Sequence, residues 1–274
     1  MAQVKVSICI PVYNGAKYIS EAINSVLNQT FQDFEIIILD NKSTDNSVAV
    51  VKNYTDPRIK LFQNESNLGM LGNWNKILTL ATGEYIKLLP ADDAIYPDCL
   101  KLQCEILDQD KKKEISLVSG RKNIVNAKGK IIFSRGFSKK RIRVSKTDAV
   151  NKNIRSGGNI IGEPGVVLFR KELLEVTGVF DASIYYTMDL DLWFRMLLHG
   201  DLFVIPDNVC IFRVSNESES TKIINRQKTD QQNFIRKVFS APEYQLTKFN
   251  YRVGLFAVVL STFFKKILYK FILN

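Results

Sequence analysis

The sequence has little of several features that would mark a specialised class of protein. Its 274 residues include four cysteines, which show neither the CxxC spacing of a zinc or redox site nor the density of a disulfide scaffold. We therefore expect reduced thiols and a cytoplasmic protein. The N-terminal residues lack the basic segment, apolar core and small-residue cleavage site of an export signal. The single histidine, His199, precedes a Gly-Asp turn and is expected at the surface.

Signatures of common nucleotide-dependent and nucleic-acid-binding proteins are also missing. After the first predicted strand there is neither the GxGxxG of dinucleotide-binding enzymes nor the GxxxxGK[ST] of P-loop enzymes. A sugar-nucleotide pyrophosphorylase would need a glycine-rich loop with Arg and Lys there, and PVYNG lacks it. No paired Cys/His spacing, RNP-type aromatic motif or basic region with heptads is present, so we expect no nucleic-acid partner.

Hydrophobic residues and positive charge are what the sequence has in quantity. Hydrophobic residues make up 46% and aromatic residues 11%, which excludes a disordered chain and allows a large core. The formal net charge of +10 is unevenly distributed. Residues 111–146 contain thirteen Lys and Arg against Glu114 alone, and residues 246–274 contain five with no acidic residue. These two segments predict contact with an anionic partner.

The C-terminal segment also has an amphipathic pattern. Its apolar residues recur every three or four positions, as on one face of a helix, with most of its cations on another face. The apolar stripe consists of Phe249, Val253, Phe256, Leu260, Phe263, Ile267 and Phe271. Lys265 and Lys266 make the apolar run too short to span a bilayer. We expect residues 246–274 to lie on an anionic membrane surface, and the alternative is a helix packed on the protein's own core or on a second copy.

The first ninety residues alternate between strand and helix patterns. Short apolar runs at residues 6–10, 35–40, 59–62 and 84–89 predict strands, and segments with helical spacing of apolar residues separate them. Successive strand-helix units predict a parallel sheet with helices on both faces. Ligands of such sheets bind beyond the carboxyl ends of the strands.

The residues at the expected strand ends are unusual, and several of them are polar. They are Pro11, Val12, Tyr13 and Asn14 after the first strand, Asp40 and Asn41 after the second, Asn67 and Gly69 after the third, and Ala91, Asp92 and Asp93 after the fourth. Adjacent carboxylates at a strand end suit a divalent cation of the Mg²⁺ or Mn²⁺ type, which prefers oxygen ligands. By themselves, Asp92 and Asp93 favour a turn that caps the next helix over a metal site, because Asp is common in turns.

The order of these motifs resembles that of a known family. PVYN, ILDNKSTD, NLG followed by Asn75, GEYIKLLPADD and DLDLWFR are similar to the motifs of the GT-A inverting glycosyltransferases of family 2, over about residues 5 to 215. The resemblance implies an α/β GT-A fold with a mostly parallel sheet. Residues 1–110 would form the Rossmann-like nucleotide-binding half and residues 111–215 the acceptor half. Residues 216–274 would form membrane-associating C-terminal helices.

The resemblance also implies roles for individual residues. Pro11, Val12, Tyr13, Asp40 and Asn41 would hold the nucleobase, Asn14 would also contact the nucleotide, and Asn67, Gly69 and Asn75 would edge the same pocket. Ala91 and Asp92 would face the ribose, and Asp93, with Asp92, would hold Mn²⁺ or Mg²⁺ at the diphosphate. Asp189 would be the general base, with Asp191 as the fallback, although a spacing of two residues should turn Asp191 away from the site.

Glu163 is a separate candidate in the second half. It lies in the glycine-rich segment 157–165, whose glycines suggest a loop that approaches a ligand closely. We expect this loop to line the acceptor side, and the alternative is a plain connecting loop.

Four positions depart from the family pattern. Met188 replaces a frequent Glu, Pro90 replaces the first Asp of DxDD, Trp74 replaces an Arg, and Ser215 stands where many relatives have His. The prediction is a metal-dependent inverting hexosyl- or N-acetylhexosaminyltransferase of surface polysaccharide or glycoconjugate biosynthesis. It would move one sugar from a nucleotide-sugar, a UDP-sugar before a dTDP-sugar, to a glycan acceptor, expected to be lipid-linked, at the inner face of the cytoplasmic membrane. The alternative is a non-catalytic relative that binds nucleotide-sugars or glycans.

Overall fold

The computed structural model describes residues 4–181, 183–215 and 224–272. Its first half is the predicted set of strand-helix units. The strands β1 (Val6–Val12), β2 (Phe34–Asp40), β3 (Ile59–Gln63) and β4 (Tyr85–Leu88) lie in the order β3-β2-β1-β4 with every pairing parallel. Every residue of β1 and β2 is buried, as expected for central parallel strands covered on both faces.

The helices of this half connect the parallel strands. They are α1 (Ile19–Leu27), α2 (Ser47–Lys52) and α3 (Gly69–Leu80). Helix α1 buries Ile19, Ala22, Ile23 and Val26, which recur at helical spacing on its inner face. The short strand β5 (Ala94–Ile95) and helix α4 (Cys99–Gln109) then lead into the second half. The predicted strands and helices of residues 6–89 are confirmed.

The same sheet continues through the second half of the chain. From β4 the order runs through β9 (Leu168–Arg170), β6 (Ile115–Asn126) and β10 (Asp201–Val214) to β5. Strand β9 is antiparallel to both β4 and β6, whereas β10 is parallel to β6. Two further strands, β7 (Ile131–Gly136) and β8 (Ile142–Val144), pair with β6 and β10. Because one sheet crosses both halves, they share a single core.

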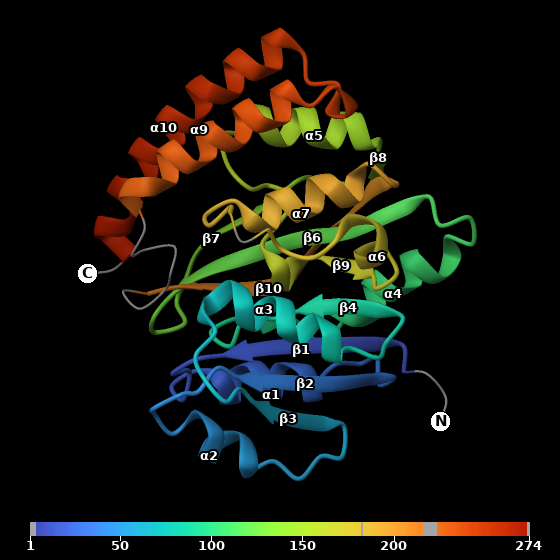
Figure 1. Cartoon of the computed structure of the whole chain (residues 1–274), viewed down its shortest axis with the longest axis vertical. Coiled ribbons are helices and arrows are strands. Elements are labelled where there is room, and N and C mark those ends of the chain that lie inside the picture. Colours follow the sequence, from blue (N-terminus) through green and yellow to red (C-terminus); the bar gives the residue numbers. More distant parts are fainter. Residues whose placement is uncertain (1–3, 182, 216–223, 273–274) are drawn as a thin grey trace.

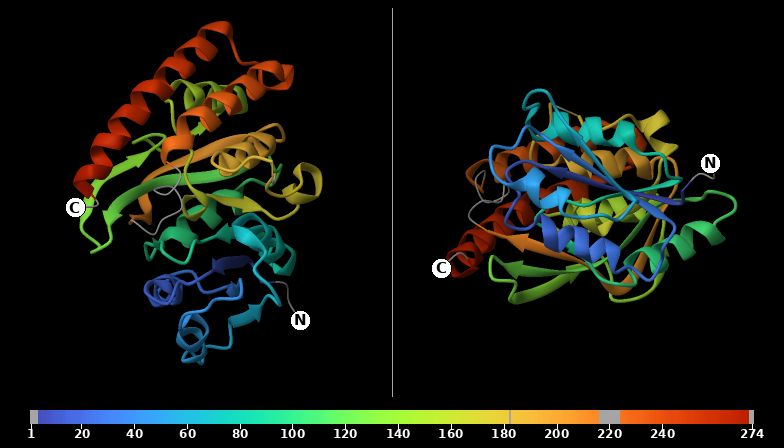
Figure 2. Two further views of the ribbon diagram at one scale, coloured as in Figure 1. Left: turned by 60° about the vertical axis from the view of Figure 1, so that its left-hand side comes forward. Right: turned by 90° about the horizontal axis from the view of Figure 1, so that it is seen from below.

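Helices of the second half cover this part of the sheet and extend beyond it. Helices α6 (Leu173–Thr177) and α7 (Met188–Leu197) follow β9, and α5 (Lys146–Arg155) lies next to α9 (Ile224–Ser240) and α10 (Lys248–Ile272). Figures 1 and 2 show α5, α9 and α10 together at the end of the molecule opposite β3. All four cysteines are free and buried, as expected.

Helix α10 turns the predicted apolar stripe outward. Phe249, Phe256 and Phe263 have exposed fractions of 69%, 65% and 60%, and Leu260 is also exposed, whereas Ile267 is partly exposed and borders the cleft described below. The side chain of Phe271 lies outside the described residues. The stripe therefore does not pack on the protein's own core. Among the described residues, no helix is both long and apolar enough to cross a membrane.

A different face of α10 holds the helix to the protein. A Cβ at Gly157 would lie 2.4 Å from the carbonyl carbon of Ala257, and one at Gly254 would lie 2.6 Å from Ile154, so α10 and its neighbours approach closely through two glycines. The hydroxyl of Ser261 donates to the Gly157 carbonyl at 2.6 Å, and Val258 is fully buried. Gly157 thus serves helix packing in a segment that we expected to approach a ligand.

A buried carboxylate connects the strands of the first half. Glu35 on β2 accepts hydrogen bonds from Ser7 (2.6 Å) and from the backbone N–H of Thr82 (2.9 Å), and it pairs with Lys60 (2.6 Å). Burial alone would raise the pKa of Glu35, but the bonds from Lys60, Ser7 and Thr82 outweigh it and lower that pKa to about 2.

Replacing this carboxylate should cost stability in a pH-dependent way. Because the folded-state pKa lies below the ordinary value of 4.5, the ionised side chain stabilises the fold above pH 4.5, and this contribution is lost as pH falls toward 2. We expect Glu35→Gln to lower the free energy of unfolding by about 2–3 kcal/mol at pH 7. In urea unfolding, the difference in free energy between the wild type and Glu35→Gln should be at pH 3 at most half of its value at pH 7. An equal difference at the two pH values would contradict this account.

Candidate active site

A cleft of about 970 Å³ runs from the carboxyl ends of β1 and β4 to helix α10. The residues that line it come from both halves of the chain. They include Pro11, Val12, Tyr13, Asn14, Asn41, Asn67, Gly69, Ala91, Asp92, Asp93, Lys122, Arg135, Glu163, Asp189, Ser215 and Lys265. All predicted site residues except Asp40, Asn75 and Asp191 thus line one cleft.

Asn41 organises the part of the cleft that follows β2 and β3. Its carbonyl oxygen accepts from the backbone N–H of Leu68 (2.9 Å) and from Asn64 (3.0 Å), and its amide donates to Asn67 (2.8 Å) and to the Gly69 carbonyl (3.1 Å). Gly69 has a φ of +72°, which favours glycine. One buried amide therefore fixes the loop that begins α3.

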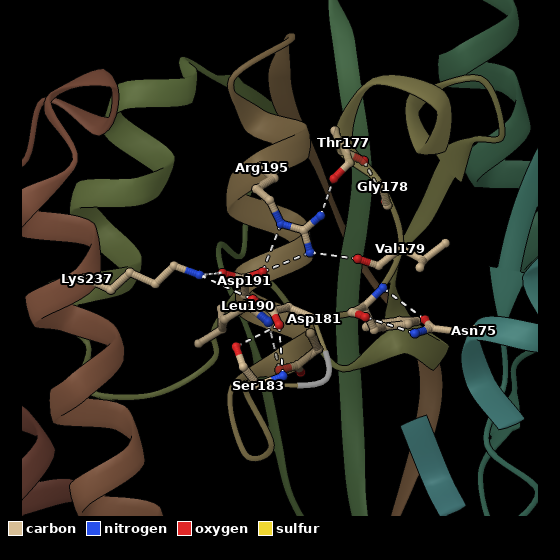
Figure 3. A network of polar contacts seen from close by, with 12 residues as sticks. Asn75, Thr177, Gly178, Val179, Asp181, Ser183, Leu190, Asp191, Arg195 and Lys237 are labelled. Atoms are coloured by element: carbon tan, nitrogen blue, oxygen red, sulfur yellow. Dashed lines mark hydrogen bonds and ion pairs between the residues drawn. The ribbon is translucent and has the colours of Figure 1, made fainter. Parts of the chain in front are cut away.

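Asp40 and Asn75 lie behind the lining of the cleft. The Asp40 carboxylate is buried at the end of β2 and accepts from the backbone N–H of Ser43 at 3.2 Å. The Asn75 amide makes two hydrogen bonds with the backbone of Phe180, at 2.9 and 3.0 Å (Figure 3). Asn75 therefore holds the segment before α7 instead of edging the cleft.

Asp92 and Asp93 lie between β4 and β5, where a strand from the other half meets them. The backbone N–H of Arg213 on β10 donates to Asp93 Oδ1 at 3.0 Å, and its guanidinium donates to the Asp92 carbonyl at 3.1 Å. The same guanidinium reaches Glu21 on α1 at 2.5 Å and lies 4.6 Å from the centre of the Tyr18 ring. Arg213 therefore joins β10, α1 and the Asp92–Asp93 segment.

The surroundings of Asp93 suit a divalent cation. Asp93 Oδ2 is buried and has no hydrogen-bond partner among the described residues, and burial, together with the charge of Asp92, raises the pKa of Asp93. A bound cation would offset both effects. The described residues contain no group of three His, Cys, Asp or Glu, so phosphate or water oxygens would have to complete the coordination.

Asp189 faces the cleft from the first turn of α7. Its carboxylate accepts from the amide of Asn159 at 2.7 Å and from the backbone N–H of Leu190 at 2.8 Å. Burial raises the pKa of Asp189, although these two bonds oppose the effect. A carboxylate that faces a cleft and has a raised pKa is suited to accept a proton.

Asp191 points away from the cleft, as its spacing from Asp189 predicts. Its carboxylate accepts from Arg195 Nε and from Lys237 on α9, both at 2.9 Å. Figure 3 shows these two cations converging on Asp191 from α7 and α9, with Arg195 also reaching the Val179 carbonyl. Asp191 is thus part of a network that holds α7.

Glu163 lies in the cleft wall and pairs with Lys122 on β6. The neighbouring Asn159 also lines the cleft, and its side chain bonds the N–H and carbonyl of Gly162, both at 2.9 Å. Part of the 157–165 loop therefore lines the cleft as expected. Gly158 instead makes room for Arg135, whose guanidinium a Cβ would approach to 2.9 Å.

Three cations in the cleft were not singled out by the sequence. Lys122 and Arg135 face each other across the β6–β7 pair, and Lys265 of α10 donates to the Tyr186 hydroxyl at 2.7 Å. The sequence shows them only as members of two basic segments, which contain many other cations. They come together because β7 and α10 both reach the cleft.

Comparison with known proteins identifies the family of this chain. The family model described as glycosyl transferase family 2 matches residues 7–175. The chain belongs to glycosyl transferase family 2. An uncharacterized protein of Mycobacterium tuberculosis is 30% identical over 224 residues, which are 80% of this chain and 70% of that protein. An uncharacterized glycosyltransferase of Methanocaldococcus jannaschii is 26% identical over 96% of this chain and 92% of its own length.

Solved structures show the same GT-A fold as this family 2 chain. S. aureus TarS 1-349 in complex with UDP-GlcNAc aligns with a TM-score of 0.69 at 20% identity, covering 93% of this chain and 71% of that one. Mannosyltransferase PcManGT from Pyrobaculum calidifontis, in complex with GDP-Man and Mn²⁺, aligns with a TM-score of 0.66 at 20% identity. It covers 94% of this chain and 70% of that one.

Removing the guanidinium of Arg213 should destabilise the junction between the halves. Arg213→Gln removes bonds to Glu21 and to the Asp92 carbonyl from a side chain with 2% exposure, so we expect a loss of about 2 kcal/mol in urea unfolding. The control Lys113→Gln removes an exposed ion pair with Glu172 (2.6 Å) and should change stability by less than about 0.5 kcal/mol. Equal effects of the two substitutions would contradict the role of Arg213.

Proposed function

We propose that this chain is a metal-dependent inverting glycosyltransferase that moves one sugar from a UDP-sugar to a hydroxyl group of a lipid-linked glycan. The observation that carries the proposal is the arrangement of the cleft. Asp92 and Asp93 lie beside the strand ends of the nucleotide half, and Asp189 faces the same cleft from α7. Family membership supports the transfer of a sugar, and the arrangement of the cleft supports the roles that we propose for these residues.

Asp189 would act as the general base. An acceptor hydroxyl is a poor nucleophile, and a carboxylate that takes its proton as the new bond forms lowers the barrier. The Asn159 amide, bonded to Asp189 Oδ2, would hold the carboxylate in place. Attack from the side opposite the nucleotide leaves the sugar inverted, and it requires no covalent intermediate.

Asp93, with Asp92, would hold Mn²⁺ or Mg²⁺. When bound, such an ion neutralises the charge that develops on the leaving diphosphate. Tyr13, half exposed at the mouth of the cleft, would lie by the nucleobase, while Asn41 keeps the neighbouring loop in place. The structure of TarS in complex with UDP-GlcNAc supports a UDP-sugar donor, whereas PcManGT is in complex with GDP-Man. The choice of a UDP-sugar for this chain is therefore a proposal.

Helix α10 supports an acceptor at a membrane surface. Its outer face exposes Phe249, Phe256 and Phe263, while Ser261, Lys265 and Leu268 of the same helix line the cleft. An amphipathic helix with exposed aromatic residues and adjacent cations binds anionic bilayers through its apolar face. The enzyme would then act peripherally at the inner face of the cytoplasmic membrane.

Substitution of Asp189 tests the catalytic assignment. We expect Asp189→Asn to lower kcat by about 10²–10⁴-fold and to change UDP affinity less than about twofold, because the amide cannot take the proton. The control Asp191→Asn should instead lower the unfolding midpoint, since it weakens the bonds to Arg195 and Lys237. The measurements are UDP release from a UDP-sugar with acceptor, and calorimetric UDP binding.

Two results would contradict this assignment. Turnover of Asp189→Asn at the wild-type rate would remove Asp189 from the mechanism. Tight UDP binding by the wild-type chain without turnover of any nucleotide-sugar and acceptor would favour the non-catalytic alternative.

Substitution on the outer face of α10 tests the membrane contact. We expect Phe256→Gln with Phe263→Gln to reduce binding to phosphatidylglycerol vesicles at low salt at least about tenfold, because two exposed aromatic side chains no longer enter the bilayer. UDP affinity should not change, since both side chains point outward. Deleting the helix is a poorer test because it also removes part of the cleft wall.

The matched control replaces exposed apolar residues elsewhere. Ile131→Gln with Val176→Gln alters side chains with 54% and 63% exposure outside α10 and should leave vesicle binding intact. The alternative is that a second copy of the chain covers this face. In that case the wild-type chain would not bind the vesicles, and it would form a dimer that the α10 substitutions dissociate.

A further inference from the structure

Lys122, Arg135 and Lys265 form a basic cluster in the part of the cleft next to α10, and Lys122 is also close enough to Asp93 for its charge to lower the pKa of that carboxyl. Each residue lines the cleft, and each comes from a different element: β6, β7 and α10. Lys122 and Arg135 are register partners, so their side chains project from the same face of the β6–β7 pair. Arg121, next along β6, instead packs against Gly136 and does not line the cleft.

The described residues supply few negative charges to this cluster. Glu163 pairs with Lys122, and the Asp189 carboxylate is held by Asn159 and Leu190. The guanidinium of Arg135 has no hydrogen bond or ion pair with any described residue, although it lies partly buried against Gly158. A partly buried guanidinium without a counter-ion is costly unless a ligand supplies the charge.

The electrostatics of Lys122 and Arg135 agree with a shortage of negative charge around these two side chains. Burial, followed by the charge of Arg135, lowers the pKa of Lys122 to about 7, and Lys265 lowers it further. Burial also lowers the pKa of Arg135. An anion placed among the three would reverse these shifts.

We propose that the basic cluster of Lys122, Arg135 and Lys265 binds a phosphate group of the acceptor. Arginine binds phosphate through paired N–H donors, and the two lysines add charge around it. The cluster lies on elements of the second half and on α10, whereas the carboxylates proposed for the donor lie at the end of β4. The inference rests on the proposed function and specifies its acceptor as a phosphate-bearing glycan.

The position of Lys265 connects this subsite with the outer face of α10. Lys265 points inward from the helix that exposes Phe256 and Phe263 on its other side. An acceptor whose lipid lies in the bilayer under that outer face would have its phosphate near the inner face of the same helix.

The test is calorimetric titration with inorganic pyrophosphate in EDTA, which keeps metal out of the donor site. We expect the wild-type chain to bind, and Arg135→Gln and Lys265→Gln each to weaken binding about tenfold, the loss expected for a charge-assisted bond. Arg135→Lys should retain part of the affinity. The controls Lys128→Gln and Lys130→Gln, on the exposed turn of the same β6–β7 hairpin, should bind like the wild type.

The same variants are titrated with UDP and Mn²⁺, where Arg135→Gln and Lys265→Gln should retain wild-type affinity. If they weaken UDP and not pyrophosphate, the cluster serves the donor and the inference is wrong. The inference is also wrong if the wild-type chain does not bind pyrophosphate. It is wrong as well if the chain binds glucuronate, an anion without phosphate, as tightly as it binds pyrophosphate. Failure of the wild type to bind UDP with Mn²⁺ would instead count against the proposed function.

Two phosphate probes distinguish the sources of the ligand. Pyrophosphate represents the diphosphate that links a glycan to its lipid, and glycerol 3-phosphate represents a phosphate within the glycan. Tighter binding of either one, with loss in Arg135→Gln, supports the subsite and identifies the source.

Discussion

The clamp made by Arg213 is the interaction on which the site depends. This arginine ends β10, yet it contacts α1 through Glu21 and fixes both the Asp93 carboxylate and the Asp92 carbonyl. The two carboxylates belong to the nucleotide half, whereas Asp189 belongs to the other half. A cleft that needs groups from both halves at defined positions requires such a junction, and the shared sheet supplies the rigid frame behind it.

The sequence predicted the nucleotide half well because its signals are local. The apolar runs of β1 and β2 and the polar strand ends follow from a few adjacent residues each, and parallel strands bring their ends to one edge. The orientations of Asp189 and Asp191 followed from helical spacing. The insertion of β9 between β4 and β6 was not predicted, since the pairing joins residues about eighty positions apart.

Other features depend on contacts that no local pattern reports. Asn75 occupies a motif position, but its amide bonds the backbone of Phe180, 105 residues later. The glycines at 157 and 158 suggested a ligand, and the structure shows them packing against α10 and Arg135. Residues 111–146 contain thirteen cations, and among the described residues only Lys122 and Arg135 of these line the cleft. Which cations reach the cleft depends on the alternation of side chains along β6 and on the pairing of β7 with β6.

Acidic and basic side chains both line the cleft. Asp92 and Asp93 lie after β4 beside Arg213, and the basic cluster of Lys122, Arg135 and Lys265 lies beside α10 together with Glu163. Asp189 faces the cleft from the second half. The three cations of the cluster come from β6, β7 and α10, which agrees with the acceptor side that we propose there.

The most direct test of this account is the Mn²⁺ electron paramagnetic resonance signal in the presence and absence of UDP. We predict that UDP and the wild-type chain together remove the free Mn²⁺ signal, and that Asp93→Asn leaves it in place at the same concentrations. UDP that binds the wild type equally well in EDTA, with no change in the Mn²⁺ signal, would contradict the central claim that the Asp92–Asp93 edge is a metal-dependent nucleotide site.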